Sequence, residues 1–198
     1  LRNNNNEEAE KNGDHFRCDP GMENMAMVLR KEIPLHIHAH RSDDICTAIR
    51  IAKEYDIRIV IVHCTDGIEI AEYIAASGFP AIVGPSMNPC SKQEVWNKSF
   101  ETAGVLNRAG VKVCITADHD VTPLYYLPIY AAMAVRFGMD DAEALRAVTS
   151  YPAEILGIDD RKGALVSGKD ADLVIWSHHP FDIHAKAEHV FIEGKQEC

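Results

Sequence analysis

Four short β-type runs, each followed by a helical pattern, constrain the fold of this chain more than any other feature of its sequence. The runs cover residues 33–38, 58–62, 80–83 and 111–116, and the roughly 22 to 31 residues between successive starts match the length of one βα unit. Between the third and fourth runs, the pattern predicts one long helix over 91–109. The second run, Arg58 to Val62, has no polar alternation after its first residue, which is typical of a strand covered on both faces. Consecutive βα units join parallel strands by right-handed crossovers. The spacing therefore predicts an α/β fold with four parallel strands, which is half of an eight-stranded barrel or most of a small open sheet.

The composition changes at both ends of this βα region. Residues 1–20 are polar and rich in asparagine, which predicts a loop or a frayed terminus. From about residue 163, short β-type runs punctuated by glycine replace the helical pattern, and they predict a small β appendage. We therefore expect a polar segment over 1–20, a partial barrel over 21–160 and a small β segment over 161–198.

Charge and composition restrict the partners of the chain. Lys and Arg number 20 against 30 Asp and Glu, a formal net charge of −10, whereas nucleic acids and anionic membranes require a positive surface. No apolar run approaches the roughly 18 to 20 residues of a membrane span, and the first residues lack the apolar core of a secretory signal. Six cysteines without a CxxC pair predict reduced thiols. We expect a cytoplasmic protein with a small-molecule partner, and neither a nucleic acid nor a membrane as its partner.

Histidine and aspartate follow three of the four predicted strands, at the ends where parallel α/β folds gather their chemistry. The candidates at these strand ends are His36, His38, His40 and Arg41 after the first run, His63 after the second, and Asp118 with His119 after the fourth. A lone histidine at a strand end is more often a hydrogen-bonded structural residue than a ligand. Three strand ends on one rim favour a metal site instead, and imidazole with carboxylate suits Zn²⁺ and similar ions. Within the first run we favour His38 as the ligand, because it lies where the apolar strand ends.

The succession HAHR, IVIVHCTDG and TADHDV resembles the amidohydrolase superfamily of metal-dependent hydrolases. Within it, the chain is most similar to the imidazolonepropionase-like branch, which includes prolidase-like dipeptidases. The tail ALRAVTSYPAEILGIDDRKGALVSGKDADLVIW is similar to the closing signature of that family, so the resemblance runs from about residue 19 to the end. It implies the C-terminal half of a (β/α)₈ TIM barrel, with about four βα units and a small β appendage.

The resemblance also implies the site and its chemistry. It makes His38 on strand five, His63 on strand six and Asp118 on strand eight the ligands of a divalent metal, with zinc expected and one or two ions in the intact family. Asp118 is then also the catalytic residue, a general base in the hydrolysis of an amide, peptide or cyclic amide C–N bond by a metal-activated water. His40, Arg41 and His119 are candidate substrate contacts. For His40 and His119 a structural role is the alternative, and for Arg41 it is a salt bridge to Asp43 or Asp44.

Some parts of the family pattern have no counterpart in this sequence. The first-strand HxH pair and the fourth-strand Lys or Glu are missing, and Cys64 and Asp120 stand where relatives usually have Gly and Pro. We therefore expect a fragment that lacks an N-terminal half and is catalytically incomplete alone; the lack of an initial Met agrees with this. The alternative is a non-catalytic truncated half-barrel or pseudo-enzyme with at most weak metal binding. Two open sheet edges predict a homo-oligomer or pairing with the missing N-terminal half.

Overall fold

The computed structural model describes residues 19–197. The polar segment predicted over residues 1–20 lies outside the described residues, apart from its last two. The first described helix, α2 (Pro20–Leu29), begins with a proline, and the side chain of Asp19 accepts hydrogen bonds from backbone N–H groups of its first turn. Both features are typical of the start of a helix, because the first N–H groups of a helix have no partner within it.

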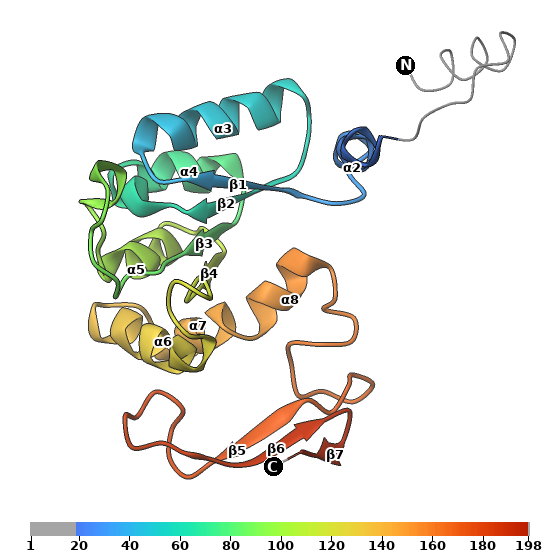
Figure 1. The fold of residues 1–198 in the computed structure, drawn as a ribbon, viewed down its shortest axis with the longest axis vertical. Coiled ribbons are helices and arrows are strands. Elements are labelled where there is room, and N and C mark those ends of the chain that lie inside the picture. The colour runs from blue at the N-terminus through green and yellow to red at the C-terminus, as the bar shows by residue number, and fades with distance from the viewer. Residues whose placement is uncertain (1–18, 198) are drawn as a thin grey trace, which may run out of the picture.

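Four parallel strands form one sheet, in the same order in space as in the sequence (Figure 1). They are β1 (Leu35–Ala39), β2 (Ile59–His63), β3 (Ala81–Val83) and β4 (Val113–Ile115). Each strand lies within its predicted β-type run or ends one residue beyond it, so the sheet predicted from the spacing of these runs is confirmed.

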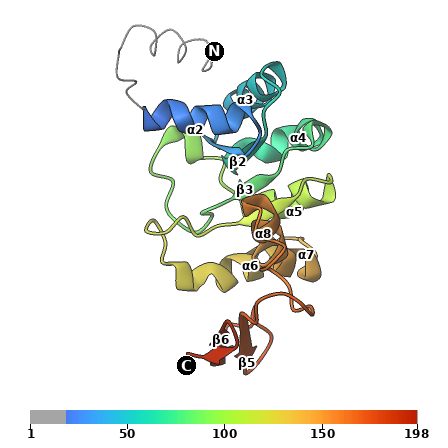
Figure 2. The same ribbon diagram turned by 90° about the vertical axis from the view of Figure 1, so that its right-hand side faces the viewer.

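Helical segments connect successive strands and stack along one side of the sheet (Figure 2). They are α3 (Ser42–Glu54), then η1 (Thr65–Ile70) with α4 (Ala71–Ser77), then η2 (Gln93–Val95) with α5 (Glu101–Arg108). The single helix predicted over 91–109 is wrong, because the residues between η2 and α5 are not helical. Side chains in this non-helical segment form hydrogen bonds with residues outside it. Asn97 donates to the Asp66 carboxylate over 3.1 Å, and Lys98 donates to the Asn88 side chain over 2.6 Å.

The main core lies between the sheet and these helices. Its fully buried members include Ile45 and Ile49 on α3, Ile61 on β2 and Leu106 on α5. Burying one such side chain stabilises a protein by about 1.5–3 kcal/mol, so these residues fix the helices on their side of the sheet. Along β1 the pattern alternates, because Leu35 and Ile37 pack against the core while the histidines between and after them are exposed. The same alternation that builds the core thus places His36 and His38 on the opposite face of the strand.

The chain after β4 forms more helices and then a separate small sheet. The helices are η3 (Leu124–Tyr126), α6 (Leu127–Arg136), α7 (Asp141–Ala147) and α8 (Ser150–Leu156). The small antiparallel sheet contains β5 (Leu173–Trp176), β6 (Ala187–Ile192) and β7 (Lys195–Gln196), and it lies at the end of the molecule remote from α2 (Figure 1). Among the described residues, no helix is both long and apolar enough to cross a membrane.

Candidate metal centre

Three histidines meet at the carboxyl ends of β1 and β2. The parallel register places Ala39 opposite His63, so the second strand delivers its histidine between His38 and His40 of the first. The ring of His38 lies 4.1 Å from that of His63 and 4.8 Å from that of His40, centroid to centroid, and the rings of His40 and His63 stack at 4.7 Å. One potential ligand nitrogen from each ring lies within 4.8 Å of the others. We call His38, His40 and His63 the imidazole cluster.

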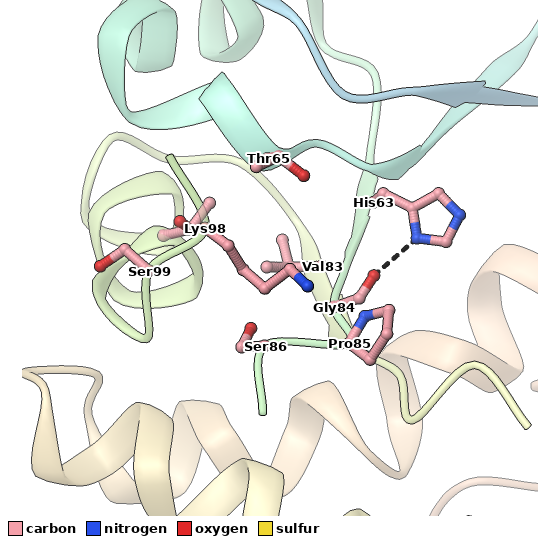
Figure 3. A pocket seen from close by; sticks show the side chains of 9 residues that line it. His63, Thr65, Val83, Gly84, Pro85, Ser86, Lys98 and Ser99 are labelled. Atoms are coloured by element: carbon pink, nitrogen blue, oxygen red, sulfur yellow. Dashed lines mark hydrogen bonds between the residues drawn. The ribbon is translucent and has the colours of Figure 1, made fainter. Parts of the chain in front are cut away.

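The His63 ring is oriented by the backbone of the next strand. Its Nδ1 lies 2.6 Å from the carbonyl oxygen of Gly84, just after β3 (Figure 3). A carbonyl oxygen can only accept, so Nδ1 donates its proton and Nε2 keeps a lone pair for a ligand. A metal-binding histidine usually donates its other ring N–H to an acceptor of this kind.

The His40 ring has a side-chain partner instead. Its Nδ1 lies 2.7 Å from the hydroxyl oxygen of Thr65, in the first turn of η1, and both side chains are buried. Burial, with smaller contributions from the neighbouring His63 and His38, lowers the pKa of His40 to about 4. Burial and His63 also lower the pKa of His38, and the carboxylates of Glu94 and Asp118 oppose that shift. The lowered pKa values favour the neutral form of His38 and His40 at pH 7, which is the protonation state that binds metals.

A carboxylate that the sequence did not single out also approaches the cluster. Glu94, in η2, has its Oε1 4.0 Å from Nε2 of His40, and the same oxygen accepts a hydrogen bond from Lys92 over 2.7 Å. No local pattern marks Glu94, because it follows β3 at a distance in an irregular loop. Only the path of that loop over the rim brings its side chain to the histidines.

Asp118 lies on the same rim but outside the imidazole cluster as defined by distance. It is half-buried, and its backbone N–H donates to the hydroxyl of Thr116 over 3.0 Å. Its carboxylate is close enough to His38 to oppose, in small part, the lowering of the His38 pKa. His119 and Asp120, the next two residues, are exposed.

Three residues at this rim have strained backbone conformations. His63, Cys64 and Asp118 have φ angles of 73°, 51° and 52°, in the left-handed region that non-glycine residues seldom adopt. Such residues cost about 1–3 kcal/mol each and cluster at functional sites.

Arg41 and His36 lie apart from the cluster. The guanidinium of Arg41 forms a paired salt bridge with Asp43, through contacts of 2.9 and 3.0 Å, which is the alternative that the sequence analysis gave for this residue. His36 is exposed on β1 and is not part of the imidazole cluster. Of the three histidines on β1 and directly after it, two therefore belong to the cluster.

A small pocket lies next to His63, which is one of the residues that line it (Figure 3). Thr65, Gly84, Ser86 and Lys98 are among the residues that line it. Thr102 lines it too, and its buried hydroxyl oxygen has no hydrogen-bond partner among the described residues.

Comparison with protein families and curated proteins places this geometry in a known context. The model of the Amidohydrolase family matches residues 25–196. An imidazolonepropionase of Brucella suis is 30% identical over 166 residues, which cover 82% of this chain and 38% of that protein. The amidohydrolase tasK of Hapsidospora irregularis is 24% identical over 176 residues, covering 87% of this chain and 18% of that protein.

Solved structures agree with this placement. An amidohydrolase from Thermotoga maritima is 42% identical and superposes with a TM-score of 0.90, covering 98% of this chain and 51% of that one. An adenosine deaminase from Xanthomonas campestris with bound zinc is 25% identical, with a TM-score of 0.61, covering 83% of this chain and 45% of that one. This chain thus spans about half the length of these two solved structures, and less of the two curated relatives above. The predicted half of a TIM barrel with a small β appendage is confirmed, and the chain belongs to the amidohydrolase family.

Proposed function

We propose that this chain supplies the carboxyl-terminal half of the active site of a metal-dependent hydrolase that cleaves a C–N bond in a small molecule. The bond is that of an amide, a peptide or a cyclic amide. The main support is the convergence of His38 and His63, whose rings lie 4.1 Å apart at the ends of neighbouring parallel strands. Family membership and the relatives named above support the same reaction class.

In this proposal, His38, His63 and Asp118 hold a divalent cation, and zinc is the ion we propose. The donors fit such an ion, because the Gly84 carbonyl occupies Nδ1 of His63 and leaves Nε2 available. When bound, an ion of this kind lowers the pKa of a coordinated water to about 7, which makes a nucleophile available at neutral pH.

Asp118 performs the proton transfer. Its carboxylate accepts a proton from the attacking water and passes it to the leaving nitrogen, the ordinary role of a general acid–base. The hydrogen bond from its backbone N–H to Thr116 helps to hold this residue in place. We propose His40 and His119 as substrate contacts, whereas Arg41 could contact a substrate only by leaving Asp43.

The other half of the site has to come from outside the described residues. Within 19–197, β1 and β4 each pair with a strand on one side only, so both edges of the sheet offer unpaired backbone groups. We infer that a complementary N-terminal half, or a second copy of this chain, covers these edges. The four cysteines that the structure describes are free, and we infer a cytoplasmic location from them.

Hydrolysis assays test the proposal. The protein assayed is this chain, expressed with any coding sequence that lies upstream of it in its gene. The substrates are dipeptides, N-acyl amino acids and cyclic amides. We expect hydrolysis that a chelator abolishes and zinc restores. We also expect Asp118→Asn to lower the rate by about 10²- to 10⁴-fold, while the matched change Asp120→Asn leaves it unaltered. Full activity of Asp118→Asn or in the presence of chelator would contradict the mechanism, and a metal-free inactive protein would favour the non-catalytic half-barrel.

A further inference from the structure

The nitrogen of His40 that faces the cluster is placed like that of a metal ligand. Its Nε2 lies 2.9 Å from Nε2 of His38, while Nδ1 of the same ring contacts Thr65. Ligand nitrogens on one tetrahedral zinc, each about 2.0–2.1 Å from the ion, lie about 3.3 Å apart. The two Nε2 atoms therefore need to separate by only a few tenths of an ångström to share an ion.

A hydrogen bond between the two rings, with no ion, is the alternative explanation of this contact, and it fits the surrounding contacts less well. Without an ion, one Nε2 must carry a proton and donate it to the other, so the ring of His38 or His40 loses its lone pair toward the cluster. Thr65 can accept from Nδ1 of His40, as Gly84 does from Nδ1 of His63. Both rings then present an unprotonated Nε2, and these outer contacts are of the type that orients metal ligands.

Glu94 supplies a negative charge, which neutral imidazole ligands lack. Its Oε1 is 4.0 Å from Nε2 of His40, and its side chain is 39% exposed, so a small rotation suffices to bring it to ligand distance. Lys92 bonds the same oxygen, which leaves the other carboxylate oxygen without that partner. One carboxylate also offsets part of the charge of a dication, which a site of imidazoles alone does not.

We propose that His40 and Glu94 are further donors to the cation, beside the two predicted histidine ligands, so that this chain binds the ion with its own side chains. The proposal rests on the metal dependence proposed above and adds two donors to it. It gives His40 the role of a ligand in place of a substrate contact. His38 lies on β1, His63 on β2, and His40 directly after β1. Glu94 lies in η2, between β3 and α5, and Asp118 follows β4. The ion then needs no donor from the missing half of the barrel.

Metal titration of the full chain tests this proposal without any substrate. Zn²⁺ affinity is measured by competition with a chelating dye, and Co²⁺ absorption in the visible range reports the number and kind of donors. We expect the chain alone to bind one ion. His40→Ala should weaken binding by more than about tenfold and change the Co²⁺ spectrum, whereas His36→Ala, on the same strand but outside the cluster, should change neither.

Two variants separate a donor role of Glu94 from a mere salt bridge with Lys92. If Glu94 is a donor, Glu94→Gln weakens binding, while Lys92→Met preserves or strengthens it by freeing the carboxylate. Equal losses in both variants would mean that the pair only holds the loop, and would overturn the role of Glu94. Circular dichroism of each variant shows whether it is folded.

The results also separate this proposal from the proposed function. Binding that survives His40→Ala but not Asp118→Asn would overturn the added donors and leave the metal-dependent hydrolase intact. An absence of metal binding by the chain alone would also overturn the added donors. It would leave the proposed function standing, because the complete protein can draw donors from elsewhere. Tight binding through His40 with hydrolysis that ignores chelators would support the site and contradict the function.

Discussion

Nδ1 of His63 donates a hydrogen bond to the carbonyl oxygen of Gly84 over 2.6 Å and so ties the end of β2 to the residue that follows β3. The bond orients the imidazole before any ion arrives. It also makes the geometry of the cluster depend on a backbone position in the neighbouring strand. Changes at Gly84 should therefore act on the stability of the whole rim.

Gly84→Ala should destabilise the protein by about 3 kcal/mol or more. Gly84 has φ +126°, and a Cβ there would lie 2.3 Å from the carbonyl oxygen of Thr116, so both strain and a backbone clash oppose the substitution. The control is Gly78→Ala, which also requires a positive φ, +74°, but meets no atom within 4 Å and should cost about 1 kcal/mol. Urea unfolding measures both, and equal losses would contradict the close approach.

Thr65→Val should lower the free energy of unfolding by about 1–3 kcal/mol. The substitution keeps the shape of the side chain but leaves Nδ1 of the buried His40 without its partner at 2.7 Å. Thr47→Val is the control, because the Thr47 hydroxyl bonds a backbone carbonyl on the exposed face of α3. Denaturant unfolding of the metal-free protein is the measurement, and an unchanged midpoint for Thr65→Val would show that the bond contributes nothing.

The metal-free protein should lose stability as the pH falls from about 6.5 to about 4. Burial holds the pKa of His40 at about 4 in the folded chain, against an ordinary value of 6.5, so the unfolded chain binds more protons in this window. The contribution is complete above pH 6.5 and disappears as the pH approaches 4. His40→Gln should flatten this part of the stability–pH curve, and a slope identical to that of the wild type would refute the assignment to His40.

Cysteine alkylation at pH 8 should spare two thiols. Burial raises the pKa of Cys64 and of Cys114 to about 12, so both remain protonated and enclosed, whereas Cys90 is exposed. Iodoacetamide should modify Cys90 in the folded protein, and Cys64 and Cys114 only after unfolding in urea. Peptide mass spectrometry measures each site, and modification of Cys64 as fast as that of Cys90 would contradict its burial.

Thr102→Val should leave the stability unchanged or raise it by about 1 kcal/mol. The hydroxyl of Thr102 is buried and has no partner among the described residues, so replacing it with a methyl group removes a desolvated polar atom. Thr102→Ala is the comparison, since it also removes the packed methyl group and should destabilise. A clear loss in Thr102→Val would show that a water in the adjoining pocket bonds this hydroxyl.

The sequence predicted the sheet well because its signals are local. The unbroken apolar run at β2 and the regular spacing of the β-type runs require parallel strands with helices between them. The convergence of His38 and His63 followed from the same spacing, because the carboxyl ends of neighbouring parallel strands share an edge. The helix predicted over 91–109 was wrong for the opposite reason: distant partners of Asn97 and Lys98 interrupt it.

By itself, then, the sequence determined the order and direction of the strands and the histidines that end two of them. The tertiary structure alone decided which further side chains lie beside these histidines. It turns His40 toward His38, and it brings Glu94, on the segment after β3, to within 4.0 Å of His40. The physical reason is one of range. Periodicity records which face of an element is buried, whereas the direction of a side chain at a strand end depends on partners that are dozens of residues away, as Thr65 is for His40.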